Sequence, residues 1–459
     1  MSSAEPVFDK VLIANRGEIA VRIARTLRKM GIASVAVYSD ADADAMHVRA
    51  ADEAHHLGPA SPAQSYLNQD RLFEIAREAG VDAIHPGYGF LSENAGFARR
   101  CEEEGFVFIG PPAGVIEAMG SKIEARRAAK AAGVPIVPGT DAAATDAAEI
   151  AAIAEELGYP VAIKASGGGG GYGMRVVNTP DAIEATLEGV RRDASRAFGD
   201  TTVYVEKFFS PAPRHVEIQV LGDTHGNVIH LGERECSLQR RFQKIVEETP
   251  SVAVSTELRQ RMGEAAVALA KQMGYQSAGT VECLVSDEGE FYFLEMNTRL
   301  QVEHPVTEEV TGVDLVKEMV QIAAGQPISI ALEGIESNGH ALEVRIYAED
   351  PTRNFMPSPG KIASMDIPDL AHLRVDTGAQ VGTNVTVYYD PMIAKLTVWG
   401  EDREAAIATM LEALRQTRIE GVKTNVDFLI RLLDAEDFRA GRIHTRYVDE
   451  NLPAIMKDA

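Results

Sequence analysis

The stretch 291-FYFLEMNTRLQVEHPVTE-308 lies near the middle of the 459-residue chain, and its first residues, Phe291 to Leu294, predict a strand. Polar residues then recur at every second position: Glu295, Asn297, Arg299, Gln301 and Glu303. Because alternate side chains of a strand point to one face, an extended conformation through Glu303 would align them all. Carboxylate and amide oxygens suit a hard cation such as Mg²⁺, and the neighbouring arginine suits an anion. This combination indicates phosphoryl chemistry, and a solvated surface strand is the alternative.

A second carboxylate precedes this stretch in 278-AGTVECLVSDEGEFYFLE-295. Two apolar runs flank the turn-forming residues 286–289, which predicts a hairpin. Pairing across that turn brings Glu282 towards Glu295, and two such carboxylates on a buried face would repel each other unless a metal ion lay between them. A solvated hairpin face carrying charge for solubility is the other interpretation, and these residues alone leave both open.

Composition limits the class of protein. The chain is 45% hydrophobic and 25% charged, which is typical of globular proteins, and its length predicts about two to four domains. A net charge of -23 argues against a nucleic-acid or anionic-membrane partner. The N-terminus has no apolar signal region, no run approaches a membrane span, and three cysteines predict neither disulfides nor a zinc site. We therefore expect a cytoplasmic protein that binds phosphates through a local cationic cluster.

The N-terminal part, residues 1–120, has the pattern of a parallel sheet. Residues 9–40 predict a strand, a loop with Gly17, an amphipathic helix and a second strand, which is a βαβ unit. Further strands are predicted at 81–89 and 106–111, so the expected fold is a doubly wound α/β domain. Gly17 is not part of a G-x-G-x-x-G motif, and a nicotinamide cofactor is not expected here.

A glycine-rich hairpin follows. Strand 159-YPVAIKAS-166 leads into 167-GGGGGYG-173 and a second strand, 174-MRVVN-178. There is no G-K-[ST], so the segment is not a P-loop, and the strand after it excludes a dinucleotide fold. We interpret it as a flap whose backbone N–H groups close over phosphates, with Lys164 adding charge. A disordered glycine linker is the alternative, which the apolar flanking strands disfavour.

Two further features point to anions. Strand 202-TVYVEKFF-209 could edge an adenine pocket, and residues 228–250 carry a basic cluster: Arg234, Gln239, Arg240, Arg241 and Lys244. An anion site is favoured over a solvated basic loop, because the strand before it should enter the same sheet as Glu282. In the last part of the chain, Arg345 lies inside the apolar strand 340-HALEVRIYAED-350, so it must pair with a carboxylate or reach an anionic ligand.

Together these motifs resemble a known family. The segments 13-IANRGEIA-20, 85-HPGYGFLSEN-94, 164-KASGGGGGYGMR-175, 235-ECSLQRRFQK-244 and 295-EMNTRLQVEHPVTE-308 are similar to those of biotin carboxylase, an ATP-grasp enzyme, and the likeness extends from Lys10 to about Asn451. It implies α/β and α+β domains: an N-terminal doubly wound parallel-sheet domain (1–120), a central ATP-grasp domain (121–326) with a flexible lid at about 134–208, and a C-terminal mixed α/β domain (339–448).

The resemblance also implies an activity and its site. ATP would phosphorylate bicarbonate to carboxyphosphate, which would supply CO₂ to N1′ of biotin. Nucleotide would be held by Lys122, Lys164, the glycines Gly169, Gly170 and Gly171, Glu206, Lys207, Phe209, His215 and Gln239. Mg²⁺ or Mn²⁺ would bind Glu282, Glu295 and Asn297. Bicarbonate would be held by Lys244, Arg299 and the Gln301–Val302 backbone, with Glu303 as its base and Arg345 stabilising the biotin enolate.

Two positions depart from the family pattern, and both affect nucleotide affinity rather than catalysis. Tyr172 stands in the glycine flap where a cation is usual, and Phe242 stands where His or another polar residue is common. The chain also shows no biotin attachment domain around Met456-Lys457, so biotin is expected in trans. The implied partners are a biotin carboxyl carrier, a carboxyltransferase of an acetyl-CoA, other acyl-CoA or 2-oxoacid carboxylase, and a second copy of the chain in a homodimer.

Two alternatives to this interpretation remain open. One is an ATP-grasp ligase that acts on a free small molecule, which Arg345 and the long third domain disfavour. The other is a nucleotide-binding scaffold without turnover, for which Tyr172 and Phe242 are the only supporting features. ATP cleavage that depends on bicarbonate and is stimulated by free biotin would distinguish biotin carboxylase from both.

Overall fold

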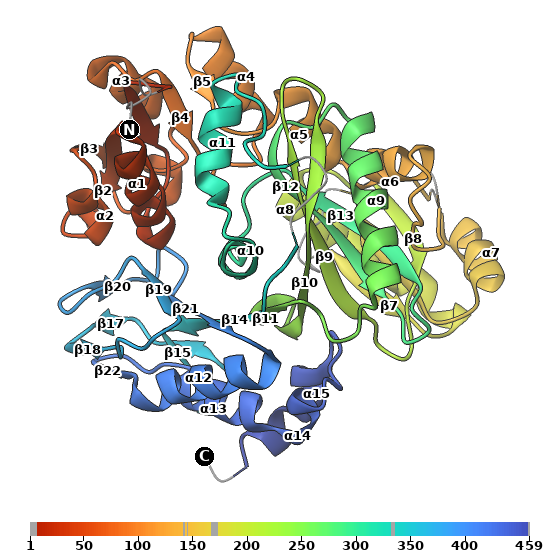
Figure 1. Ribbon diagram of the computed structural model, residues 1–459. Helices are drawn as coiled ribbons and strands as arrows, with labels where there is room; N and C mark the ends of the chain where they lie inside the picture. Colours follow the sequence, from red (N-terminus) through yellow and green to blue (C-terminus); the bar gives the residue numbers. More distant parts are fainter. Residues whose placement is uncertain (1–6, 141–142, 145, 167–172, 332–335, 458–459) are drawn as a thin grey trace.

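The computed structural model describes residues 7–140, 143, 144, 146–166, 173–331 and 336–457. The N-terminal residues, in red in Figure 1, the central residues, in yellow and green, and the C-terminal residues, in blue, form three bodies of secondary structure. Helix α10 (His304–Thr311) lies near the centre of the view, between them. No helix in the described ranges is long and apolar enough to cross a lipid bilayer.

The N-terminal body contains a parallel sheet in the order β3-β2-β1-β4-β5. Successive residues of β1 point to opposite faces: Val11 and Ile13 pack with helices α1 and α11, whereas Leu12 packs with α3 and α4. Both faces are therefore covered, as the predicted doubly wound fold requires. The elements are β1 (Lys10–Ile13), α1 (Gly17–Met30), β2 (Ala33–Ser39), α2 (Met46–Ala50), β3 (Glu53–Gly58), α3 (Gln69–Ala79), β4 (Ala83–His85), α4 (Ala95–Glu103), β5 (Val107–Phe108) and α5 (Ala113–Gly120).

After α6 (Lys122–Ala131), a small antiparallel sheet in the order β7-β6-β8 carries α7 (Ala147–Leu157) and α8 (Ile183–Phe198). Its strands are β6 (Val161–Ala165), β7 (Met174–Val177) and β8 (Val203–Lys207). The predicted strand–loop–strand hairpin is confirmed, because β6 and β7 pair from Val161↔Val177 to Lys164↔Met174. The expected flap residues Gly169, Gly170, Gly171 and Tyr172 lie outside the described residues.

An antiparallel eight-stranded sheet in the order β13-β12-β9-β10-β11-β14-β21-β19 forms the largest layer. Its strands are β9 (Arg214–Gly222), β10 (Val228–Arg240), β11 (Gln243–Thr249), β12 (Ser277–Val285), β13 (Phe291–Asn297), β14 (His340–Tyr347), β19 (Leu373–Thr377) and β21 (Met392–Gly400). Strand β14 begins the expected C-terminal domain, yet it pairs with β11. The sheet therefore continues from the central to the C-terminal body, and side chains of both can meet on one face.

Helices cover this sheet. Helix α9 (Thr256–Gln272) packs in the core of the central body, and α11 (Leu315–Ala323) joins the core of the N-terminal sheet. In the C-terminal body, β14 and β21 share a core with α12 (Arg403–Gln416), α13 (Val426–Asp434), α14 (Glu436–Arg439) and α15 (Tyr447–Ile455). The short strand pairs here are β15 (Glu349–Asp350) with β16 (Met356–Pro357), β17 (Gly360–Lys361) with β20 (Asn384–Val385), and β18 (Ser364–Asp366) with β22 (Arg418–Glu420).

Candidate active site

A cavity of about 1040 Å³ receives side chains from all three bodies. It is lined by the described residues that the sequence motifs assigned to a site, with the exception of Glu206: Lys122, Lys164, Lys207, Phe209, His215, Gln239, Lys244, Glu282, Glu295, Asn297, Arg299, Val302, Glu303 and Arg345. Those on the long sheet meet, although they are far apart in the chain, because the sheet places its strands side by side in the order β13-β12-β9-β10-β11-β14.

The predicted pairing of the two carboxylate strands is confirmed. Strands β12 and β13 join through a turn in which the N–H of Ser286 donates to the carbonyl of Glu290, and Glu282 lies opposite Glu295 in the register. Each carboxylate has a cationic partner. Glu295 pairs with Lys122, and Glu282 Oε1 lies 2.9 Å from Lys244 Nζ, while its Oε2 lies 3.1 Å from His215 Nε2. Burial acts to raise the pKa of Glu282, but Lys244 and His215 outweigh it and hold that pKa well below its usual range.

The donor set of this hairpin fits a hard divalent cation. Glu282, Glu295 and Asn297 supply oxygen donors from adjacent strands, and Asn297 Nδ2 donates to Glu282 Oε1 at 2.8 Å. Lys122 and Lys244 pair with these carboxylates, so a divalent cation would compete with their ammonium groups for the same oxygen atoms. A second buried group, His215, Glu217 and Glu282, places its ligand atoms within 4.8 Å of one another.

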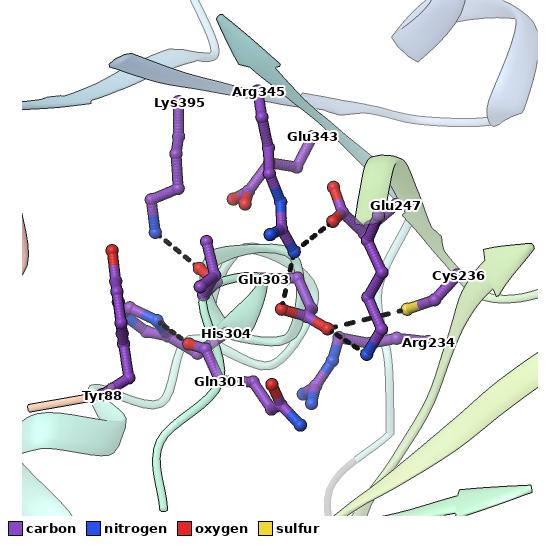
Figure 2. Close-up of polar contacts among 12 residues, drawn as sticks. Tyr88, Arg234, Cys236, Glu247, Gln301, Glu303, His304, Glu343, Arg345 and Lys395 are labelled. Carbon is purple, nitrogen blue, oxygen red and sulfur yellow. Dashed lines mark hydrogen bonds and ion pairs between the residues drawn. The ribbon is translucent and has the colours of Figure 1, made fainter. Parts of the chain in front are cut away.

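Glu303 lies at the centre of a buried charge cluster. Its Oε1 is 2.6 Å from Lys244 Nζ and its Oε2 is 2.9 Å from the Arg345 guanidinium, which also pairs with Glu247 (Figure 2). Burial acts to raise the pKa of Glu303, but Lys244, Arg345 and Arg234 together hold that pKa well below its usual range. Glu303 is therefore ionised, and it sits between two cations that line the same cavity.

The expectation that one strand extends through Glu303 is wrong. Strand β13 ends at Asn297, and Glu303 is the residue that precedes α10, whose first turn contains Pro305. The polar residues after Asn297 therefore do not share a strand face. They reach the same cavity because the chain turns after Asn297. The Arg299 side chain is held there by two hydrogen bonds: Nε donates to Glu93 Oε2 of the N-terminal body at 2.8 Å, and Nη1 donates to Gln301 Oε1 at 2.8 Å.

The expected nucleotide residues in the described part of the chain line the same cavity, with the exception of Glu206. Lys164 pairs with Glu206, and Glu206, which also pairs with Arg126, is not among the residues that line the cavity. Lys207 Nζ donates to the carbonyl of Gly158 at 2.7 Å, and the Phe209 ring lies 5.1 Å from that of Tyr292. Gln239 Nε2 and His215 Nδ1 lie 3.0 Å apart.

The predicted basic cluster divides between the cavity and the protein interior. Lys244 and Gln239 face the cavity, but Arg234 is fully buried and pairs with Glu217 at 2.6 Å. Arg240 faces Glu349 and the ring of Phe355. The expectation of an anion site made by the whole cluster is therefore wrong for Arg234 and Arg240, because neither lines the cavity and both face carboxylates of the protein. Phe242, at the turn between β10 and β11, is exposed and borders the cavity.

Three carboxylates of the site were not predicted: Glu93, Glu217 and Glu247. Glu217 is fully buried and accepts from Lys244 Nζ at 2.6 Å. The alternation His215, Glu217, Gln219 in an otherwise apolar strand was the signal that could have found it. Glu93 and Glu247 carry no such local signal, since their partners lie more than 90 residues away along the chain.

Comparison with known proteins decides the family. Residues 7–116 match the biotin carboxylase N-terminal domain, residues 121–331 match the ATP-binding domain of the carbamoyl-phosphate synthase L chain, and residues 343–450 match the biotin carboxylase C-terminal domain. The chain belongs to the biotin carboxylase family. This confirms both the resemblance seen in the motifs and the three-part fold expected from it.

Known biotin carboxylases match the sequence of this chain over nearly its full length. It is 51% identical to biotin carboxylase 2 of Bacillus subtilis, over 97% of this chain and 100% of that protein. It is 52% identical to the biotin carboxylase of Halalkalibacterium halodurans, over 97% of this chain and 98% of that protein. The biotin carboxylase domain dimer of Hydrogenobacter thermophilus 2-oxoglutarate carboxylase, crystallised with MgADP, ADP and bicarbonate, is 47% identical and superimposes with a TM-score of 0.94, covering 98% of each chain.

Proposed function

We propose that this enzyme uses ATP to activate bicarbonate and then carboxylates biotin, which is the first half-reaction of a biotin-dependent carboxylase. The observation that carries the proposal is Glu303, an ionised carboxylate between Lys244 and Arg345 at a cavity that also contains Lys122, Lys164 and the Glu282–Glu295 pair. This chemistry needs a base, cations that bind an anion, and side chains that bind phosphate, all within one cavity.

The nucleotide is assigned to the end of the cavity nearest β6 and β8. Lys122, Lys164, His215 and Gln239 would contact phosphates or ribose, and the backbone of Gly169, Gly170 and Gly171 would close over the phosphates. Glu206 and the backbone from Lys207 to Phe209 would border the adenine. Glu282, Glu295 and Asn297 would hold Mg²⁺ or Mn²⁺, which would neutralise phosphate charge when bound.

Bicarbonate is assigned to Arg299, Lys244 and the Gln301–Val302 backbone. Glu303 would take the bicarbonate proton, so that the resulting oxygen attacks the γ-phosphorus of ATP and ADP leaves. A strongly ionised carboxylate is a weak base, but its low pKa has an identifiable cause, the hydrogen bonds from Lys244 and Arg345. A bound anion competes for those donors, and their loss raises the basicity of Glu303 when bicarbonate arrives.

Carboxyphosphate then breaks its C–O bond to phosphate into CO₂ and phosphate. Biotin N1′ gives its proton to the phosphate released in that step and attacks CO₂, and Arg345 would stabilise the negative charge that develops on the ureido oxygen. Biotin would be presented on a carrier protein or domain, and a carboxyltransferase would move the carboxyl group onward. A homodimer is supported by the dimer of the Hydrogenobacter relative. The cytoplasmic location stays a prediction from the sequence.

The test is an ADP-release assay with ATP and Mg²⁺, run with and without bicarbonate and free biotin. The proposal expects ATP cleavage that depends on bicarbonate and is stimulated by biotin, with ¹⁴C-bicarbonate appearing in carboxybiotin. Cleavage that is indifferent to biotin would favour a ligase for another acceptor. ATP binding without release of phosphate under any of these conditions would favour the scaffold alternative.

A further inference from the structure

Two fully buried side chains hold consecutive carbonyl groups of the segment that leads into α10. His304 Nδ1 lies 2.8 Å from the carbonyl oxygen of Gln301, and Lys395 Nζ donates to the carbonyl oxygen of Val302 at 2.5 Å. Lys395 belongs to β21 of the C-terminal body, and both side chains are 0% exposed. In the view of Figure 2, His304 and Lys395 lie on one side of this segment and the Glu303 carboxylate lies on the other.

This arrangement sets the direction of two backbone N–H groups. The peptide bonds from Gln301 to Val302 and from Val302 to Glu303 are not among the cis bonds of the described chain, so each is trans and its C=O and N–H point in opposite directions. Holding the carbonyls towards His304 and Lys395 turns the N–H groups of Val302 and Glu303 to the opposite side. Within the described ranges, neither N–H donates to another protein group, and both residues line the cavity. Successive free N–H groups form a small anion-binding concavity.

Lys395 is itself fixed by the N-terminal body. Its ammonium lies 3.1 Å from Glu18 Oε1 of α1, and the same oxygen accepts from the hydroxyl of Tyr88, another residue that lines the cavity. Glu343 and Asp376 add negative charge around it. Burial acts to lower the pKa of Lys395, but Glu18, Glu343 and Asp376 outweigh it, and the net effect is a raised pKa and a charged ammonium. A charged donor on a single carbonyl oxygen makes a stronger contact than a neutral one.

We propose that Lys395 is a positioning residue for bicarbonate: by holding the Val302 carbonyl, it aims the Glu303 N–H at the substrate anion, beside the Val302 N–H, whose direction the His304 contact sets. This inference rests on the proposed function and deepens it. It assigns a part of bicarbonate recognition to a lysine that does not line the cavity, and it makes the N-terminal body, through Glu18, a participant in that recognition.

The test compares wild-type enzyme with Lys395→Met, which keeps most of the side-chain volume and removes the donor. The KM for bicarbonate should rise about tenfold, the change expected for loss of one charge-assisted hydrogen bond. The KM for ATP should stay within about threefold, because the nucleotide end of the cavity is not touched. If both KM values rise together, or neither changes, Lys395 is merely structural and the proposal is wrong. Should Lys395→Met not fold, as judged by its thermal unfolding transition, Lys395→Gln is measured against the same two outcomes.

A matched control comes from the same strand. Thr397 lies two residues beyond Lys395 on β21, is fully buried, and donates to Glu343 Oε2 at 2.7 Å, with no contact to the Val302 carbonyl. Thr397→Val also removes a buried polar contact, and it should leave the KM for bicarbonate unchanged. A rise equal to that in Lys395→Met would show that any polar loss on β21 has this effect, which would overturn the proposal.

Calorimetric titration of bicarbonate into the MgADP-loaded enzyme separates the two proposals. If the wild-type enzyme turns over ATP with biotin and Lys395→Met binds bicarbonate equally well, only the positioning role fails. If the wild-type enzyme binds bicarbonate but shows no biotin-stimulated turnover, the proposed function fails, and the comparison of the two Kd values still decides whether Lys395 positions the anion site.

Discussion

Arg345 illustrates how burial commits a charged side chain to particular partners. It lies inside a strand that is buried along its whole length, and its guanidinium reaches both Glu303 and Glu247. Burial acts to lower the pKa of Arg345, but Glu247, Tyr347 and Glu303 outweigh it and raise that pKa well above its usual value. The guanidinium therefore stays charged beside Glu303, the proposed base.

Arg345→Ser should separate the two half-reactions. Losing a donor aimed at developing negative charge costs on the order of 100-fold or more in rate, so biotin carboxylation should fall by at least that factor. Bicarbonate-dependent ATP cleavage should persist, because Glu303 keeps Lys244 as its partner. Both rates are measured by ¹⁴C fixation and ADP release.

The control for this change is the double variant Arg345→Ser/Glu247→Gln. It also removes the charge of Glu247, which loses its arginine partner in the single variant. It should regain thermal stability without regaining biotin carboxylation. Glu303→Gln, by comparison, should lose both activities together. Equal loss of both activities in Arg345→Ser would mean that its main role is to pair with Glu247 and Glu303.

Glu295→Gln tests the metal assignment. The change keeps the shape of the side chain but removes one of the two facing charges, so the Mg²⁺ concentration needed for half-maximal activity should rise steeply while the fold stays intact. The measurement is an activity titration with MgCl₂ alongside a thermal melt. Glu288→Gln, in the exposed turn of the same hairpin, is the matched control and should change neither. An unchanged metal titration in Glu295→Gln would contradict the assignment.

At the scale of elements, the short helix α2 is tied to the N-terminal sheet by His47. Nε2 of this buried ring lies 3.2 Å from the carbonyl oxygen of Val37 in β2, and Nδ1 accepts from the N–H of Gly17 at the start of α1. That arrangement needs a neutral ring, since a second ring proton would face the Gly17 N–H. Burial lowers the pKa of His47 to about 4.

The stability of this region should therefore depend on pH. Folding lowers the pKa of His47, so as the pH falls the unfolded chain binds this proton before the folded protein does, and proton binding then favours unfolding. The stability that neutral His47 contributes is therefore present above about pH 6.5 and is lost as the pH falls towards 4. At pH 5 the loss should be about 2 kcal/mol. His47→Gln keeps a donor and an acceptor but does not titrate. Thermal melts at pH 7.5 and pH 5 should then differ less for the variant than for the wild-type protein, and an equal difference in both would contradict the assignment.

At the scale of the whole molecule, one carboxylate joins the three bodies. Glu308, on α10, lies 2.8 Å from Arg22 of α1 through one oxygen and 2.7 Å from Arg374 of β19 through the other. Arg22 also pairs with Asp314, and Arg374 pairs with Asp376. Because α10 directly follows Glu303, this network ties the segment that carries the proposed base to the N-terminal and C-terminal bodies, in accord with the central position of α10 in Figure 1.

Arg22→Met should weaken the attachment of the N-terminal body. Removing one partner of a buried ion pair costs about 3–5 kcal/mol, because the remaining carboxylates lose their compensation. The variant should melt at a lower temperature and show an early transition in calorimetry. Arg71→Met, which breaks an exposed pair with Glu74 in the same body, should cost less than about 1 kcal/mol. Equal effects of the two changes would show that the network does not hold the bodies together.

The sequence by itself determined what depends on local pattern. Alternation and turn residues placed β12 and β13 and aligned Glu282 with Glu295. The apolar strand around Arg345 predicted that this arginine pairs with a carboxylate or reaches an anionic ligand, and it pairs with Glu303 and Glu247. These inferences succeeded because strand periodicity and hairpin turns act over a few residues. The polar run after Asn297 was misread for the same reason, since its alternation resembles a strand although the chain turns there into α10.

Only the tertiary structure decided which charges meet. Glu303 lies 59 residues from Lys244 and 42 from Arg345, and Lys395 lies 93 residues from the carbonyl that it holds. Nothing in the local pattern distinguishes a buried arginine that pairs with a carboxylate, such as Arg234, from a lysine that lines the cavity, such as Lys244. Burial makes unpaired charge costly, so each charged side chain takes the partner that the packed sheet places beside it, and that neighbour is set by how distant strands assemble.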